Sequence, residues 1–459
     1  MIKLKPHCKL NQILPEETEV MKKHALIITH AFPPILAVAT YRPLRMTKAL
    51  EQAGWSVSVI TVFPANVRFR ERSDALLEHI SPNTEVVRVA DSVSQRMWLE
   101  KSKVLGRLRL LPVARKVVKG LLQVKTKILY PKSFKSFNSL KRSYGASFSQ
   151  FDMAWLCPAL KEGLKIHERK PLTAILATVP PFVSSSLAYE LSREINVPYV
   201  LDYRDLYVGN PMGDPSPADA NMESVFIDSA SQIIAVAKGA VQSLESRTST
   251  PVSYLPNGFD QNLFSKYLNR DTDNATGRLS LIHAGTLYEG FGLSALIEGL
   301  EGIDSSDYCL KLAGSIDLAT RQSAEGSSAS VQILGTVQSD EALELVSASD
   351  VSIAVGASES DRGIIRAKIF EMMALRTPSI YVGSPDDEGA LLLKESGLLV
   401  GSATNAEELK AIVESLIAAK KEGRALCQPK EDIISRYELQ VQGPALVGII
   451  EAVAEETLA

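Results

Sequence analysis

The chain alternates short apolar segments with helix-forming runs, and it does so in two separate arrays. The first array opens with an apolar segment at 25–29, a helical run at 41–53 and a second apolar segment at 57–62. A strand, a helix and a second strand in this order form a parallel pair, because the helix returns the chain to the starting edge of the sheet. The repeated pattern predicts an α/β protein built on doubly wound parallel sheets.

The two arrays also predict the domain organisation. With 459 residues the chain exceeds the size of one ordinary core, so two domains are expected. The turn signal Pro256, Asn257, Gly258 separates the arrays. We predict a Rossmann-like N-terminal domain over 24–255, a Rossmann-like C-terminal domain over 256–435, and a final helix over 436–459 that packs back toward the N-terminal domain. Such domains face each other across a cleft at their strand ends, where ligands bind.

The charge is distributed very unevenly. The whole chain has a formal net charge of −3, yet residues 92–146 hold fourteen Lys or Arg and one acid, Glu100, so this segment is +13 and the remainder is −16. Aliphatic side chains alternate with the bases at helical spacing, which suits a helix lying on an anionic membrane surface. A nucleic-acid patch needs fewer aliphatic residues, and we predict no nucleic-acid partner. A solvated basic insertion is the alternative.

Cysteine usage and hydropathy predict a location. The four cysteines are far apart and form no CxxC or Cys/His cluster, which argues against a zinc site or a disulfide framework and fits a reducing compartment. The first twenty residues hold no apolar core of signal-peptide length, and no later run reaches bilayer length. We predict a cytoplasmic protein that is peripheral at the inner face of the cell membrane.

A helix-forming run at 362–378 carries the strongest sign of a ligand site. Lys368 and Glu371 are three residues apart and therefore share one helix face. Strand-like segments at 351–355 and 379–382 flank the run, so its N-terminus lies where ligands of parallel sheets bind. A cation and a carboxylate there could hold a phosphate and a ribose diol, and the ordinary alternative is a surface ion pair. Neither GxGxxG nor GxxxxGK[ST] occurs, which weakens dinucleotide and P-loop interpretations.

Five blocks together resemble a known family. They are AFPPILAVATYRPLRMTKALEQAGWSVSVITV, TVPPFVSSSLAYELSREINVPYVLDYRDLY, LPNGFD, LIHAGTLYEGFGL and AKIFEMMALRTPSIYV. In this order they resemble the family-4-like retaining glycosyltransferases of the GT-B fold (glycosyl transferases group 1). The resemblance implies a hexosyltransferase-type enzyme that moves a sugar from a nucleotide-sugar donor to a glycan acceptor with retention of configuration. It implies no metal and no further cofactor. With the basic segment, it suggests a lipid-linked acceptor in envelope or exopolysaccharide biosynthesis.

The resemblance also implies donor-binding residues in the C-terminal domain. Glu371 matches a glutamate that accepts hydrogen bonds from the donor ribose, and Lys368 and Arg366 would face the donor phosphates. Gly285 matches a glycine that lets the backbone approach the diphosphate. Thr286 and Asn257 complete the expected donor site. Two departures stand out: the family's first paired glutamate would fall at Gly363, and the run TLYEG at 286–290 holds no base where better-known members have an Arg and a Lys after the glycine.

The N-terminal domain supplies the expected catalytic and acceptor residues. Asp202, Arg204 and Asp205 lie at the end of a predicted strand, where Arg204 would face the cleft with Asp202 or Asp205 beside it. An internal salt bridge is the structural alternative. His30 could act on an acceptor hydroxyl, or simply pack after its strand. Arg42 could contact the acceptor or a phosphate, or be an exposed cation in the first helical turn.

Two other functions remain open from the sequence. The absence of bases after Gly285 and the glycine at 363 favour a catalytically silent GT-B scaffold that binds a partner or the membrane surface, because stabilising a departing diphosphate is largely an electrostatic task. The second alternative is a nucleotide-sugar epimerase of the same fold. Retention of Lys368, Glu371 and the DYRD sequence favours the glycosyltransferase.

Overall fold

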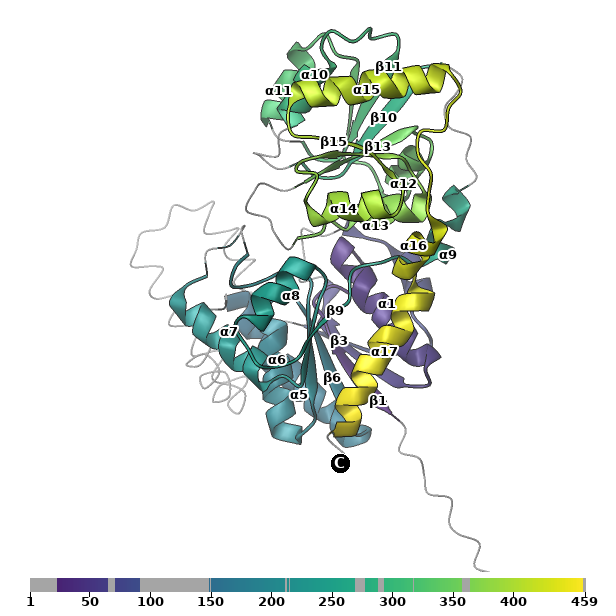
Figure 1. Ribbon diagram of the computed structural model, residues 1–459. Coiled ribbons are helices and arrows are strands. Elements are labelled where there is room, and N and C mark those ends of the chain that lie inside the picture. The colour runs from purple at the N-terminus through teal and green to yellow at the C-terminus, as the bar shows by residue number, and fades with distance from the viewer. Residues whose placement is uncertain are drawn as a thin grey trace, which may run out of the picture.

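The computed structural model describes residues 23–64, 71–90, 148, 150–210, 213, 215–268, 277–287, 293–316, 318–356 and 364–456. These residues form two α/β domains, one above the other in Figure 1, with α13 and α14 of the upper domain facing α1 and α8 of the lower one. The basic segment 92–146 lies outside the described residues, so its predicted membrane contact remains a prediction. Within the described ranges, no helix is both long and apolar enough to cross a bilayer.

A seven-stranded parallel sheet forms the centre of the N-terminal domain, in the order β5-β3-β1-β6-β7-β8-β9. The order reverses between β1 and β6, as in Rossmann-like domains. Its central strands are apolar on both faces, which is typical of a parallel sheet covered by helices on both sides. The strands are β1 (His24–Ile28), β3 (Ser56–Val62), β5 (Glu85–Val89), β6 (Ala174–Val179), β7 (Tyr199–Tyr203), β8 (Gln232–Ala235) and β9 (Val252–Tyr254).

Helices cover both faces of this sheet. Two short antiparallel strands and a 3-10 helix contribute side chains to the space between the domains: β2 (Ile35–Leu36), β4 (Glu71–Arg72) and η2 (Asp74–His79). The α-helices are α1 (Val38–Gln52), α5 (Gln150–Arg169), α6 (Val183–Ile195), α7 (Pro217–Ser229) and α8 (Lys238–Glu245). The Ser216 side chain caps α7 and Pro217 opens it, which is a favourable arrangement for starting a helix.

A six-stranded parallel sheet forms the C-terminal domain, in the order β12-β11-β10-β13-β14-β15. The reversal falls between β10 and β13. The strands are β10 (Leu279–Ala284), β11 (Tyr308–Ala313), β12 (Val331–Gly335), β13 (Val351–Val355), β14 (Ser379–Val382) and β15 (Leu399–Ala403). Its helices are α10 (Leu293–Leu300), α11 (Leu318–Gly326), α12 (Ser339–Ser347), α13 (Lys368–Leu375), α14 (Glu388–Glu395) and α15 (Ala406–Lys421).

The chain crosses between the domains twice, and the two crossings are paired. After β9, the chain forms α9 (Gln261–Phe264) and η3 (Ser265–Tyr267); it returns through α16 (Glu431–Ile434) and η5 (Ser435–Tyr437). Phe259 N–H donates to the Tyr437 carbonyl at 3.0 Å, and Leu439 N–H donates to the Phe259 carbonyl at 2.9 Å. Gly258 is required beside them, because a Cβ there would lie 2.1 Å from the Tyr437 carbonyl oxygen.

The last helix, α17 (Leu439–Glu456), lies along α1 of the N-terminal domain (Figure 1). Leu446, Val447 and Ile450 are buried in one apolar cluster with Leu44 and Leu50. The helix α17 therefore ties α1 to the inter-domain crossing. Because α1 also lines the space between the domains, this packing fixes one wall of that space.

Candidate functional site

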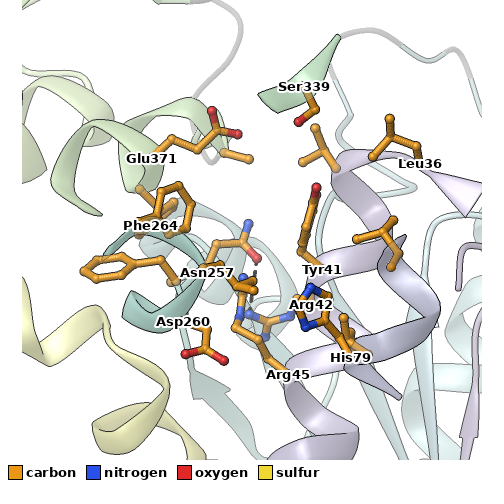
Figure 2. A pocket seen from close by; sticks show the side chains of 18 of the residues that line it. Leu36, Tyr41, Arg42, Arg45, His79, Asn257, Asp260, Phe264, Ser339 and Glu371 are labelled. Carbon is orange, nitrogen blue, oxygen red and sulfur yellow. Dashed lines mark hydrogen bonds between the residues drawn. The ribbon is translucent and has the colours of Figure 1, made fainter. Parts of the chain in front are cut away.

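A cavity of about 1030 Å³ lies between the two domains. Its N-terminal wall comes from segments that follow β1, β7 and β9, together with η2. Its C-terminal wall comes from α9, α12 and the segment that follows β13 and enters α13. Cavities that hold small molecules commonly measure about 300 to 1,000 Å³, so this one has room for more than one modest ligand. Figure 2 shows side chains from both domains converging on it.

Six of the residues predicted from the sequence line this cavity: Arg42, Arg204, Asp205, Asn257, Arg366 and Glu371. They come from four separate regions of the chain and from both domains. Asp202 is fully buried next to the cavity, and Lys368 lies beside Glu371 on α13. The structure thus brings together most of the residues expected to bind a donor and an acceptor.

Arg204 and Asp205 stand at the carboxyl end of β7. The Arg204 Nε donates to Thr178 Oγ1 at 3.0 Å, and its Nη2 donates to the Pro180 carbonyl, which fix the guanidinium at the cavity wall. Burial raises the pKa of Asp205, while Arg204 and Arg366 oppose this rise. Two cations and one carboxylate therefore face each other where the domains meet.

Asp202 pairs with Arg42 in this structure. The Arg42 Nε lies 3.0 Å from both carboxylate oxygens and its Nη2 lies 2.7 Å from Oδ1, with side chains 5% and 0% exposed. The remaining Arg42 donors reach the Leu255 and Pro256 carbonyls, each at 3.0 Å, and Asn257 Oδ1 at 3.4 Å. All three guanidinium nitrogens are thus bonded to protein oxygens. The pair joins α1 and β7 to the first crossing between the domains.

The opposite wall is the entry to α13. Lys368 Nζ donates to Glu371 Oε2 at 2.7 Å, and the two side chains are 36% and 25% exposed. A pair this accessible contributes at most about 1 kcal/mol, so a ligand can exchange for it at little cost. Arg376 and Gln261 hold the other end of α13 against the crossing segment. The helix is therefore rigidly placed while its first turn stays open to the cavity.

Besides Asp202 and Lys368, three further predicted residues lie outside the cavity lining. The His30 ring packs edge-on against Trp155 of α5, with centroids 4.3 Å apart. Gly285 ends β10, where its N–H donates to the Ala313 carbonyl at 2.8 Å, and Thr286 is exposed. A Cβ at position 285 would lie 3.4 Å from His283 Nε2, a tight but not impossible contact. Gly285 and Thr286 therefore mark the strand end at the reversal point of the second sheet.

His283 of β10 lies inside that reversal point. It is 8% exposed, and its Nδ1 lies 3.0 Å from the Ile353 carbonyl of β13. A carbonyl only accepts, so Nδ1 carries the proton and Nε2 is the unprotonated nitrogen. Within the described part of the chain, Nε2 is buried with no hydrogen-bond partner. Burial and nearby Lys368 lower the His283 pKa to about 4, against the opposing hydrogen bond to Ile353.

This histidine predicts an acid-dependent loss of stability. Its folded pKa of about 4 lies below the ordinary value of 6.5, so the unfolded chain binds the proton first as the pH falls. The contribution of His283 to the free energy of unfolding is complete above about pH 6.5 and declines by about 3 kcal/mol toward pH 4. Urea unfolding of His283→Phe between pH 7 and 4 should show a smaller decline than the parent chain. An equal decline of the unfolding free energy in both chains would show that His283 does not cause it.

The sequence interpretation missed several residues of the cavity wall. They are Tyr41, Arg45, Asp260, Phe264 and Ser339. Figure 2 shows the Tyr41 hydroxyl directed toward Ser339 of α12, so α1 reaches the other domain here. Helical spacing could have indicated Tyr41 and Arg45. Arg45 follows Tyr41 by four residues and the predicted site residue Arg42 by three, so these side chains lie on the same side of a helix. Asp260, Phe264 and Ser339 approach the site only through the relative placement of the domains.

Comparison with known proteins gives the fold. No protein-family model matches the sequence, and no curated protein matches it. Solved structures match over nearly the whole chain. The Anabaena protein HepE, in complex with UDP and glucose, is 15% identical, with a TM-score of 0.61 over 94% of this chain and 100% of that one. The fold is GT-B.

Two further GT-B structures are similar over their whole length. Sucrose-phosphate synthase from Thermosynechococcus elongatus is 17% identical, with a TM-score of 0.55 over 95% of this chain and 97% of that one. WaaG, a glycosyltransferase involved in lipopolysaccharide biosynthesis, is 13% identical, with a TM-score of 0.53 over 93% of this chain and 99% of that one. The predicted α/β class, the GT-B fold and the resemblance to glycosyltransferases of this fold are confirmed.

Proposed function

We propose that this chain is a glycosyltransferase that takes a sugar from a nucleotide-sugar donor and adds it to a glycan acceptor, with retention of configuration. The observation that carries the proposal is the cavity between two Rossmann-like domains, lined by Glu371 and Arg366 on one side and by Arg204 and Asp205 on the other. The whole-chain likeness to HepE, whose structure contains UDP and glucose, supports the same class of donor.

The donor would bind to the C-terminal wall. Glu371 would accept hydrogen bonds from the ribose hydroxyls once it exchanges Lys368 for the ligand. Lys368 and Arg366 would then face the diphosphate, beside Asn257 and the strand end at Gly285 and Thr286. A carboxylate and two cations within six residues match the alternating hydroxyl and phosphate chemistry of a nucleoside diphosphate.

Charge stabilisation of the leaving diphosphate would come from arginines of both domains. Arg366 and Arg204 lie near the same carboxylate, Asp205, on opposite walls. Moving the walls together would place both guanidinium groups on the diphosphate and would exclude water. This arrangement would replace the bases that the family carries after Gly285, and it requires no metal ion. Asp205 would hold the two cations in place.

The acceptor would enter from the N-terminal wall. We propose a glycan acceptor that is lipid-linked and lies at an anionic membrane surface, to which residues 92–146 would bind through their net charge of +13. WaaG, a structural neighbour, is involved in lipopolysaccharide biosynthesis, which is consistent with this class of acceptor. The protein would then act as a peripheral membrane enzyme of envelope or exopolysaccharide assembly.

Donor turnover tests the activity. Purified protein is incubated with UDP-, GDP-, ADP- and dTDP-sugars, with and without anionic vesicles that carry a lipid-linked glycan, and release of nucleoside diphosphate is measured. Release from one donor that increases with the acceptor supports transfer, and the anomeric configuration of the product tests retention. Conversion of the donor sugar without nucleotide release would identify an epimerase instead. Donor binding without turnover would identify the silent scaffold that the glycine at 363 suggests.

A further inference from the structure

Arg45 is an unpaired cation on the wall of the inter-domain cavity. It lies on α1, one turn after Arg42, and it lines the cavity. Arg42 has every guanidinium nitrogen bonded to a protein oxygen. Among the residues that the structure describes, Arg45 has neither a hydrogen bond nor an ion pair. The two arginines on this helix therefore differ in role. Arg42 is held by protein oxygens, whereas Arg45 is available to a ligand.

The carboxylates nearest to Arg45 are already engaged. Asp260 accepts Lys48 Nζ at 2.5 Å on Oδ2 and the Asn262 N–H at 3.2 Å on Oδ1. Both oxygens of Asp202 accept from Arg42. Burial and repulsion from Arg42 lower the pKa of Arg45 to about 9, although Asp260 and Asp202 oppose this. Arg45 is partly buried, and a partly buried charge without a partner costs some free energy, which is recovered when an anion binds.

The position of Arg45 separates it from the donor residues. Figure 2 shows Glu371 on α13 on one side of the cavity and Arg45 on α1 with Asp260 on the other. The cavity volume of about 1030 Å³ leaves room for a second ligand beside a nucleotide sugar. His79 and Arg72 line the same N-terminal wall. The unpaired cation thus faces the part of the cavity that the proposed donor does not need.

We propose that Arg45 forms a phosphate-binding subsite for the acceptor, so that the acceptor of this enzyme carries a phosphate group. The inference rests on the proposed function and names the acceptor class. A guanidinium binds a phosphate through two parallel N–H donors, which positions the phosphate as well as attracting it. The phosphate can belong to a soluble sugar phosphate or to the phosphate of a lipid carrier, and both present the same terminal oxygens.

The experiment compares Arg45→Met, Arg45→Lys and the parent chain, with Lys165→Met on the exposed face of α5 as the matched control. Thermal unfolding is followed against inorganic phosphate at constant ionic strength. Phosphate should stabilise the parent and the control, with binding to Arg45→Met weaker by about tenfold or more and partly restored in Arg45→Lys. Without phosphate, Arg45→Met should be as stable as the parent or more stable, since an unpaired and partly buried charge is removed.

Two further sets of titrations identify the source of the phosphate. They also distinguish failure of the phosphate subsite from failure of the proposed glycosyltransferase activity. Hexose 6-phosphate in solution and polyprenyl phosphate in phosphatidylcholine vesicles are titrated against the same variants, and UDP is titrated in parallel. Binding of either phosphate that is lost in Arg45→Met, with UDP binding retained, supports the proposal. Equal phosphate binding by the parent and Arg45→Met, or a loss of UDP binding in place of phosphate binding, overturns it. A parent chain that binds phosphate but no nucleotide contradicts the proposed function alone.

Discussion

Asp202→Asn is expected to destabilise the N-terminal domain by about 3 to 5 kcal/mol. The substitution leaves the Arg42 guanidinium buried without its counter-charge, and removal of one partner of a buried pair has effects of this size. Arg42 is 5% exposed, so water cannot compensate for the loss. The same side chain joins α1 to the carbonyls of Leu255 and Pro256. The first crossing between the domains should therefore loosen together with the domain.

Urea unfolding followed by tryptophan fluorescence measures this effect, because all three tryptophans, Trp55, Trp98 and Trp155, precede the C-terminal domain. The control is Lys23→Met, which removes a 2.5 Å ion pair with Glu451 whose side chains are 44% and 35% exposed. That variant should lose less than about 1 kcal/mol. The double variant Arg42→Met/Asp202→Leu should recover part of the loss, since no charge remains buried. A loss in Asp202→Asn no larger than in the control would show that the buried pair is not structural.

Glu371→Ala is expected to weaken nucleotide binding by about 10-fold to 150-fold. Hydrogen bonds to an ionised group contribute about 1.5 to 3 kcal/mol, and 1.4 kcal/mol corresponds to a factor of ten in affinity. Stability without ligand should change little, because the Lys368–Glu371 pair is partly exposed. Titration calorimetry with the preferred nucleoside diphosphate measures the affinity directly.

The matched control is Glu395→Ala, an exposed glutamate at the end of α14 in the same domain. It removes the same charge and the same number of atoms outside the cavity. Its nucleotide affinity should equal that of the parent chain. An equal loss of affinity in both variants would indicate a long-range charge effect, and no loss in either would remove Glu371 from the donor site.

Much of the architecture could be predicted from local patterns. Parallel strands buried on both faces have short apolar runs, so β1, β6, β10 and β13 were recognisable, and alternation with helices predicted two doubly wound sheets. Edge elements were harder. The strand β5 contains Glu85 and Arg88, whose side chains bind Ser58 and the Pro33 carbonyl, so its apolar signal is weak. The last helix begins at Leu439, before Pro444, because packing against α1 outweighs the cost of an early proline.

The candidate site was predictable only in part, for a physical reason. Residues such as Glu371, Arg204 and Asp205 follow strands of parallel sheets, and such positions meet at one edge whatever the rest of the chain does. Whether two cavity residues touch depends on how the domains are placed, which local patterns do not record. Packing within one domain is not recorded by local patterns either: Asp202 of β7 pairs with Arg42 of α1, 160 residues away, and not with Arg204, two residues away. Arg45, three residues after Arg42 on the same helix, has no such partner among the described residues.

We expect the inter-domain cavity to bind a nucleotide-sugar donor. Thermal unfolding of the purified chain against UDP, GDP, ADP and dTDP tests it most directly. At a ligand concentration about a hundredfold above the dissociation constant, one nucleotide should stabilise the protein by about 2.7 kcal/mol. The stabilisation should disappear in Glu371→Ala and persist in Glu395→Ala. Failure of all four nucleotides to raise the unfolding temperature would contradict a donor site in this cavity and would favour a GT-B scaffold without a donor.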